Sequence, residues 1–352
     1  MAMMLASTSL LALVTLAQAP APLLSHTFTS GDDGWQGIGE IAKVSRTAPP
    51  KPVLSFEYMV NKTNLNALVR TIEPEALKGA QRLHFALKTD TDTVLAFMVQ
   101  EKGGGRFMAV ATMPKNLWQE IDLAVTDLSL GRDPGDPADA NGKLDTEKIE
   151  SITVVDLHEF LVRMESAAVT TLFPDLSSGP RELWMREFTV NTAPLPASSL
   201  DGLSRPQLSW IGVGGAGLKR VSAGGPLTGT NLEVTYSVAP GKFSGLFHAI
   251  PTGTLTGKAS LGVSLAVAKS ASLMVQLEDD QGGKFNAMVE VPGVRSPRKI
   301  SLSWSDFKPA DDSKRDKMDV ARVKQIMILD ISGITESVQQ NNTLWLANLE
   351  AK

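Results

Sequence analysis

The chain has 352 residues, a formal net charge of −4, 43% hydrophobic and 20% charged residues, and no cysteine. This length suits two domains that each bury a core, and the lack of cysteine excludes disulfides, thiolate metal sites and cysteine nucleophiles. Lysine and arginine are dispersed and form no run that would follow a phosphate backbone, so we expect no nucleic-acid partner.

The N-terminus has the pattern of an export signal. A short apolar stretch between Leu5 and Leu16 ends in Ala17-Gln18-Ala19, which is an A-x-A cleavage pattern. We predict a signal peptide over residues 1–19 and an exported mature chain, either periplasmic or extracellular. The positive charge that usually opens such a signal is missing, and the alternative is a buried N-terminal strand or helix. No other segment has the ~20 apolar residues that a membrane span needs.

Several segments of the first half alternate apolar and less apolar side chains with a period of two, which predicts β-strands. The turn Gly103-Gly104-Gly105 separates two of these segments and favours a hairpin, because glycine tolerates positive φ angles. We expect single helical turns over residues 145–149 and 319–323. The alternating apolar positions are Leu83, Phe85, Leu87, Leu95, Phe97, Val99, Ile121, Leu123 and Val125.

The second half of the chain repeats the first. At an offset of 178 residues the two copies align without a gap from Leu54 to Pro114, and small insertions change the offset further along. The first copy carries an extra stretch, residues 163–180, before its last strand. A period this long indicates duplicated domains rather than a solenoid. Matched pairs include Trp35 with Trp210, Tyr58 with Tyr236, Leu83 with Leu261, Phe107 with Phe285, Asp156 with Asp330 and Trp184 with Trp345.

These patterns predict an all-β chain of two tandem antiparallel β-sandwich domains, each most simply a two-sheet sandwich or a jelly roll. We place the first sandwich at residues 20–192 and the second at residues 207–352. The proline- and serine-containing segment 193–206 suits a short, fairly extended linker.

The order of elements resembles galactose-binding-like jelly rolls, the fold shared by many carbohydrate-binding modules and by the complex I intermediate-associated protein family. The similar parts are a leading Gly34-Trp35, the turn Gly104-Gly105-x-Phe107, the run from Trp118 to Leu128 and a closing Leu183-Trp184, with counterparts in the second copy. The resemblance implies the sandwich fold and sugar binding.

Tryptophans are the candidate ligand contacts, because aromatic faces stack on sugar rings and also fill cores. Trp35 and Trp210 repeat, as do Trp184 and Trp345, and repeated positions flanked by apolar residues are expected in the core. Trp118 does not repeat and lies beside Lys115 and Asn116. We therefore predict Trp118 as the exposed aromatic of a ligand-binding surface.

One loop has the oxygen-rich composition of a calcium site. Asp136, Asp139, Asn141 and Asp145 surround a glycine, and a hard cation prefers several carboxylate and carbonyl oxygens on a curled backbone. The loop departs from the EF-hand register at Pro137 and Lys148. Calcium is thus one hypothesis for these four residues, and a plain solvated loop is the other; we predict no other cofactor.

Two further motifs fail in their context. Gly212-Val-Gly214-Gly-Ala-Gly217 has the spacing of a dinucleotide-binding glycine motif, but no helix pattern follows it. His158-Glu159 lacks the second histidine of a zinc-binding helix, since Val162 stands there. The four histidines are dispersed, and we expect isolated surface or edge residues.

Together these observations predict an exported, non-catalytic protein that binds a carbohydrate or a cell-envelope glycan. The alternative is a structural or protein-interaction module of the cell envelope. No acid–base pair or nucleophile–base pair stands out, so no catalytic residue is predicted. The oligomeric state and the ligand stay open.

Overall fold

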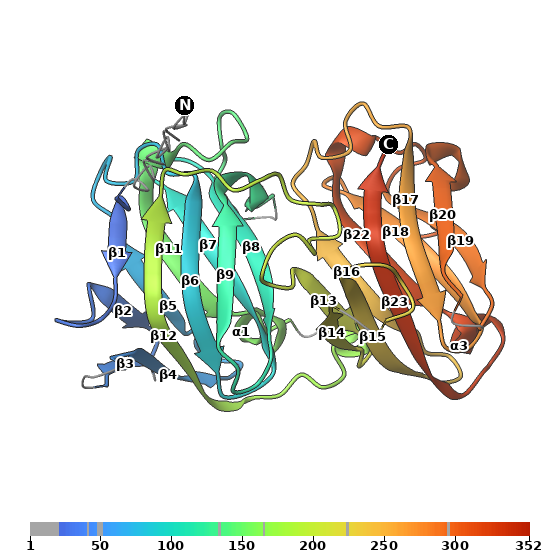
Figure 1. The fold of residues 1–352 in the computed structure, drawn as a ribbon, viewed down its shortest axis with the longest axis horizontal. Coiled ribbons are helices and arrows are strands. Elements are labelled where there is room, and N and C mark those ends of the chain that lie inside the picture. Colours follow the sequence, from blue (N-terminus) through green and yellow to red (C-terminus); the bar gives the residue numbers. More distant parts are fainter. Residues whose placement is uncertain are drawn as a thin grey trace, which may run out of the picture.

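The computed structural model describes residues 21–40, 42–47, 52–132, 135–164, 166–222, 225–293 and 296–352. Figure 1 shows two β-sandwiches side by side, the first built from β1 to β12 and the second from β13 to β23. The predicted signal peptide over residues 1–19 lies outside the described residues. Within the described residues, no helix is long and apolar enough to cross a membrane.

The first sandwich consists of two antiparallel sheets. Sheet A has the order β3 (Lys43–Arg46), β4 (Leu54–Val60), β12 (Gly179–Asn191), β6 (Arg82–Thr89) and β9 (Gln119–Ala124), with β1 (Leu24–His26) also on β12. Sheet B has the order β10 (Ser129–Leu130), β8 (Arg106–Met113), β7 (Thr93–Glu101), β11 (Ile149–Asp156), β5 (Ala67–Thr71) and β2 (Trp35–Ile38).

The second sandwich repeats this order, except that β1 has no counterpart among the described residues. Sheet C has the order β13 (Trp210–Val213), β16 (Ser244–Ala249), β22 (Val323–Asp330), β18 (Ala271–Asp279), β19 (Lys284–Val291) and β21 (Lys308–Pro309). Sheet D has the order β14 (Gly217–Val221), β15 (Asn231–Val238), β23 (Gln340–Ala351), β17 (Ser260–Val267) and β20 (Arg298–Ser303). The chain passes repeatedly between the two sheets of a sandwich, as in a jelly roll. The predicted all-β fold of two tandem sandwiches is confirmed.

Helical structure is limited to short turns. The expected turns after Asp145 and Asp319 are both present as 3₁₀ helices. The described helical elements are η1 (Val125–Asp127), η2 (Thr146–Lys148), α1 (His158–Leu161), α2 (Ala167–Leu172), η3 (Trp304–Asp306), η4 (Val320–Arg322) and α3 (Ser332–Thr335).

Each sandwich has its own core between its two sheets, with a buried tryptophan at the matched position. Trp35 and Trp210 are 1% and 0% exposed, as the repeat predicts. The indole nitrogen of Trp35 donates to His26 Nδ1 at 3.0 Å, whereas that of Trp210 donates to the Asp201 carbonyl at 2.7 Å. The two copies thus satisfy the same buried donor with different partners, as burial of a polar group requires.

The extra stretch of the first copy joins the two sandwiches. The C-terminal end of this stretch is fixed by the buried guanidinium of Arg181. It donates to Asp156 Oδ2 at 2.7 Å and to the carbonyl of Ser177, within the stretch, at 2.9 Å. At the end of α2, the carbonyl of Leu172 accepts a hydrogen bond from the Gly214 amide of the second sandwich at 2.7 Å. The glycine motif of the sequence therefore forms the turn between β13 and β14. This turn is hydrogen-bonded to the extra stretch of the first copy.

Apolar side chains on the outer faces of sheets B and C also join the sandwiches. Ala96 and Val110 of sheet B form one buried cluster with Ile211 of β13. Phe173 and Phe247 belong both to this cluster and to a second one on the outer face of sheet C. The members of the second cluster on sheet C include Val213, Met327, Leu329 and Met274. Removing these outer faces from water gives a hydrophobic driving force for association of the two sandwiches.

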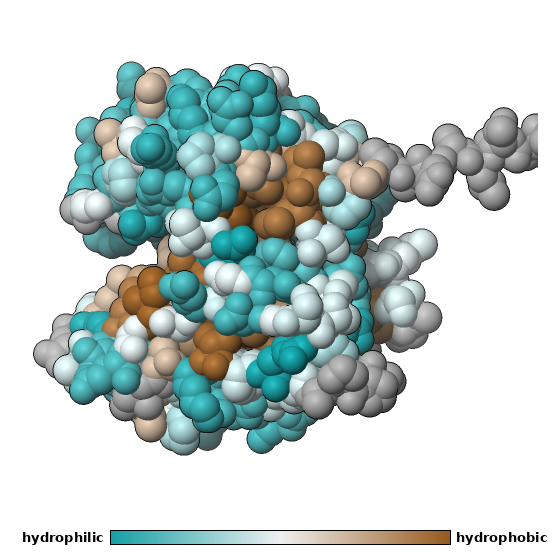
Figure 2. All heavy atoms as spheres, turned by 90° about the vertical axis from the view of Figure 1, so that its left-hand side faces the viewer, coloured by the Kyte–Doolittle hydropathy of each residue, from teal (hydrophilic) through white to brown (hydrophobic). Residues whose placement is uncertain are grey.

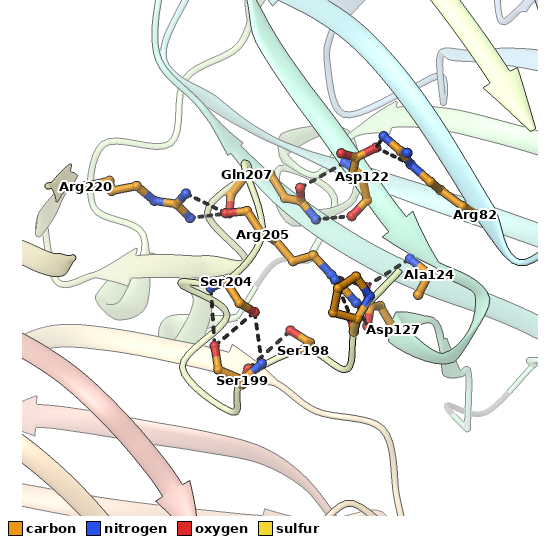
Figure 3. Close-up of polar contacts among 11 residues, drawn as sticks. Arg82, Asp122, Ala124, Asp127, Ser198, Ser199, Ser204, Arg205, Gln207 and Arg220 are labelled. Atoms are coloured by element: carbon orange, nitrogen blue, oxygen red, sulfur yellow. Dashed lines mark hydrogen bonds and ion pairs between the residues drawn. The ribbon is translucent and has the colours of Figure 1, made fainter. Parts of the chain in front are cut away.

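The segment expected to be a linker is fixed to both sandwiches at its C-terminal end. Arg205 forms a bidentate ion pair with Asp127, with Nε and Nη2 at 2.9 and 3.1 Å from the carboxylate oxygens (Figure 3). Gln207 bonds the backbone of Asp122 through both ends of its amide, at 3.0 and 2.8 Å. Arg220 of the second sandwich donates to the Gln207 carbonyl at 2.8 Å. These contacts attach the segment to the edge strand β9 on one side and to β14 on the other.

The ion pair can be tested with a matched pair of substitutions. Asp127 and Asp306 occupy equivalent positions and accept from the backbone N–H of Ala124 and Ser303. Among the described residues, an arginine pairs with Asp127 and none pairs with Asp306. We expect Asp127→Ala to lower the free energy of unfolding by about 3 kcal/mol more than Asp306→Ala, because it leaves the buried Arg205 without a counter-charge. Urea unfolding measures both free energies. Equal decreases for the two variants would contradict a stabilising role of the Arg205–Asp127 ion pair.

Candidate functional site

A row of three side chains crosses the outer face of sheet A. Trp184 of β12 lies opposite Lys88 of β6, and Trp118 stands just before the start of β9, beside Lys88. Their neighbours Leu183, Met185 and Leu87 point into the core, so the alternation of the strands directs Trp184 and Lys88 outward. We call Trp118, Lys88 and Trp184 the tryptophan row. Sheet A faces the viewer in Figure 1, with β12, β6 and β9 in front.

The cation of Lys88 lies between the two indole rings. Its Nζ is 4.1 Å from the ring centre of Trp184 and 5.6 Å from that of Trp118. The guanidinium carbon of Arg186 is 5.0 Å from the ring centre of Trp118. Cations attract the negative faces of indoles at these distances, and this attraction orients both rings. Both tryptophans stay half-buried, with part of each ring at the surface.

Charged side chains continue the outer face of sheet A next to the tryptophan row. Arg186 forms an ion pair with Glu120, and the fully buried methyl group of Ala86 lies opposite Glu120 in the register of β6 and β9. His84 contacts Asp122 Oδ1 at 2.9 Å and Glu120 Oε2 at 3.2 Å. The surface therefore combines two aromatic faces with several hydrogen-bond donors and acceptors.

The matched surface of the second sandwich is closed. Trp345 corresponds to Trp184 but is only 5% exposed, because it packs with Leu227, and its indole nitrogen donates to Glu233 at 2.9 Å. Two alanines, Ala266 and Ala347, replace Lys88 and Arg186 beside it, and both are buried. The open tryptophan row is thus a feature of the first copy.

The sequence predicted part of this site. Trp118, predicted as an exposed aromatic residue, lies half-buried at the surface beside sheet A. The expectation that Trp184 belongs to the core is wrong, since it stands on the outer face of β12. The sequence did indicate the outward position of Trp184, because its neighbours Leu183 and Met185 are core residues and side chains alternate between the two faces of a strand. No sequence motif pointed to Lys88, Arg186 and Glu120, because these residues come together only when strands β6, β12 and β9 pair.

The histidines differ in part from the expectation of isolated surface or edge residues: His26 lies on the edge strand β1, but it is buried, as is His248. His26 and His248 are 5% and 8% exposed, and each contacts the buried tryptophan of its own sandwich. His158 accepts from Arg181 at its Nδ1, at 2.7 Å. Glu159, next in the chain, is buried and bonded to Asn66 at 2.9 Å and to Arg163 at 2.6 Å. The His-Glu pair therefore contacts Arg163 and Arg181, at the two ends of the extra stretch.

His84 makes the candidate site sensitive to pH. Its hydrogen bond to Asp122, with the nearby charges of Asp122 and Glu120, raises the pKa of the imidazole above its usual 6.5 despite the opposing effect of burial. A raised pKa means that the charged form is favoured in the folded state. Its stabilisation is complete below the unfolded pKa and is lost as the pH rises through the folded pKa.

We expect the stability advantage of the native chain over His84→Gln to be largest near pH 5.5 and to shrink towards about pH 8.5. Thermal unfolding of both proteins across this range measures the difference. His26→Gln is a useful control, because burial lowers the pKa of His26 and its effect must have the opposite slope. A constant difference between native and His84→Gln proteins would contradict the predicted linkage.

The oxygen-rich loop is held by contacts of its own. Asp139 accepts from the backbone N–H groups of Asn141, Gly142 and Gly105. The carboxylate of Asp145 accepts from the Lys148 ammonium at 2.7 Å and from the Asn141 amide at 3.1 Å, and Lys148 lowers the pKa of Asp145.

Asp136 lies 3.6 Å from Arg106. Among the described residues, no group of three or more histidine, aspartate or glutamate side chains is arranged to hold a metal. These contacts favour the solvated-loop hypothesis, and calcium binding by Asp136, Asp139, Asn141 and Asp145 is the hypothesis that stays untested.

We expect removal of calcium with EDTA and its addition at millimolar concentration to leave the Tm of the chain unchanged, because Asp139 and Asp145 already have partners. Differential scanning calorimetry provides the measurement. A rise in Tm with calcium that disappears in Asp139→Asn would instead identify the loop as a calcium site.

Several solved structures are similar to this chain. The family 11 carbohydrate-binding module of Clostridium thermocellum, in complex with a β-1,3-1,4-mixed-linked tetrasaccharide, is 14% identical, covers 40% of this chain and 86% of its own, and has a TM-score of 0.32. The N-terminal tandem of two family 22 modules from Paenibacillus barcinonensis is 15% identical, covers 96% of this chain and 98% of its own, and has a TM-score of 0.30.

An exo-β-agarase is 12% identical over 50% of this chain and 25% of its own, with a TM-score of 0.34. No protein-family model and no curated protein matches the chain. The fold assignment rests on the strand order and pairings of the chain itself.

Proposed function

We propose that this chain is an exported, non-catalytic carbohydrate-binding protein whose ligand lies on the tryptophan row of the first sandwich. The observation that carries the proposal is the pair of half-buried indoles, Trp118 and Trp184, held on one face of sheet A by Lys88. The C–H faces of sugar rings pack on indoles, while sugar hydroxyls exchange hydrogen bonds with charged side chains. Lys88, Arg186 and Glu120 supply such groups within the same surface.

The second sandwich has a supporting role in this proposal. Its equivalent tryptophan is covered, and its sheet C is joined to sheet B through the apolar clusters. We also propose the boundaries 20–192 and 207–352 for the two domains, with residues 1–19 as the signal that directs export. The second sandwich then acts as a fixed support that leaves sheet A of the first sandwich accessible.

A structural or protein-interaction module is the alternative function. Such a module is expected to offer a continuous apolar surface to its partner. Figure 2 shows the end of the first sandwich that faces away from the second, where apolar patches are separated by hydrophilic side chains. The exposed large apolar residues of the first sandwich are scattered in sequence; they are Leu23, Ile38, Leu65, Met108, Leu117 and Met164. On the face that Figure 2 shows, hydrophilic side chains thus divide the apolar surface of the described residues into separate patches.

The proposal is tested by screening the mature chain on a glycan array and measuring affinities by calorimetry. We expect Trp184→Ala and Trp118→Ala each to weaken binding at least tenfold, equivalent to ~1.4 kcal/mol, because each removes one stacking face. Trp304→Ala in the second sandwich is the matched control and should bind as the native chain does. Binding that survives both substitutions on sheet A would contradict the site, and a native chain that binds no glycan would favour the interaction module.

A further inference from the structure

A cavity lies at the seam between the two sandwiches, and its lining residues do not include those of the tryptophan row. Its volume is about 220 Å³, and its walls come from β8 and η1 of the first sandwich, from the linker and from the end of β16. A water needs roughly 10–15 Å³ on this scale, whereas drug-sized ligands fill pockets above ~300 Å³. The cavity therefore has room for a molecule of about monosaccharide size.

The ionic groups of the cavity are already neutralised. Asp127 and Arg205, which both line it, satisfy each other through two hydrogen bonds, and the remaining Arg205 nitrogen donates to the Pro196 carbonyl at 2.8 Å (Figure 3). The amide of Gln207 is bonded at both ends to Asp122. A charged ligand would find no free counter-charge among these groups, so the cavity favours a neutral one.

His248 gives the cavity an unused hydrogen-bond acceptor. Its ring stacks on Trp210, with centroids 4.9 Å apart, and its Nδ1 lies 3.1 Å from the Ser209 carbonyl. A carbonyl only accepts, so Nδ1 carries the proton and Nε2 has a free lone pair. Burial lowers the pKa of His248, which keeps the ring neutral. Within the described residues, Nε2 makes no hydrogen bond, and His248, which lines the cavity, is 8% exposed.

The rest of the lining is partly polar and partly apolar. The Ser129 hydroxyl of β10 is half-buried and forms no hydrogen bond within the described part of the chain. Val110, Leu123 and Ile250 supply apolar wall. A ligand hydroxyl can donate to the lone pair of Nε2, and the Ser129 hydroxyl can form a second hydrogen bond with the same ligand.

We propose that this cavity binds a small, neutral, polyhydroxylated molecule such as a free monosaccharide, with a ligand hydroxyl donating to His248 Nε2. The ligand's apolar face then packs on the aliphatic wall. This site is independent of the tryptophan row and takes contributions from both sandwiches and from the linker.

The test uses the full chain with a panel of neutral monosaccharides and inositol, and with glucuronate as the charged comparison. Saturation-transfer NMR and calorimetry should detect saturable binding of at least one neutral compound and much weaker binding of glucuronate. His248→Phe, which keeps an aromatic ring against Trp210, should weaken that binding at least tenfold. Trp184→Ala should leave it unchanged, which separates this site from the tryptophan row.

A measurement on the native chain covers the case in which His248→Phe does not fold. The ¹⁵N resonance of the unprotonated His248 nitrogen should shift when the ligand is added, because that nitrogen gains a donor. The proposal is overturned if no neutral compound binds, if a bound compound leaves this resonance in place, or if a folded His248→Phe protein keeps full affinity.

Discussion

The apolar contact between the outer faces of sheets B and C is the constraint on which the rest of this molecule depends. An antiparallel sheet usually buries one face and leaves the other to water. Here the outer faces of sheets B and C are buried as well. The buried residues include Val110 and Ala96 on sheet B and Ile211 and Val213 on sheet C. Sheets B and C thereby form the contact between the two sandwiches, and sheets A and D keep their outer faces outside this contact.

Duplication followed by specialisation accounts for the differences between the copies. The same strand order is kept in both, and so are the buried tryptophan and the hydrogen bond from Tyr58 to Asp156 or from Tyr236 to Asp330, each at 2.9 Å. Around this constant frame, the first copy has the extra stretch and an open pair of indoles. In the second copy, Leu227 closes over the equivalent tryptophan. We interpret the second sandwich as the support and the first as the binding unit.

Much of the fold was predictable because its determinants are local or repeated. Period-two alternation located strands such as β6 and β9, and the offset of 178 residues, which holds from Leu54 to Pro114, paired the copies. The outward position of Trp184 was predictable in principle from Leu183 and Met185, but repetition of the residue pointed to the core. The fixed end of the linker was not predictable, since Arg205 and Gln207 find Asp127 and Asp122 only after the sheets form. The same holds for Lys88 between its two indoles.

The most direct test of this account is a measurement of residual dipolar couplings for the backbone amides of both sandwiches in one weakly aligned sample. If the apolar contact, the extra stretch and the linker hold the sandwiches as one body, a single alignment tensor will fit both sets of couplings. Two tensors of different size or orientation would show that the sandwiches move independently. That result would contradict a shared interface, and with it the cavity at the seam.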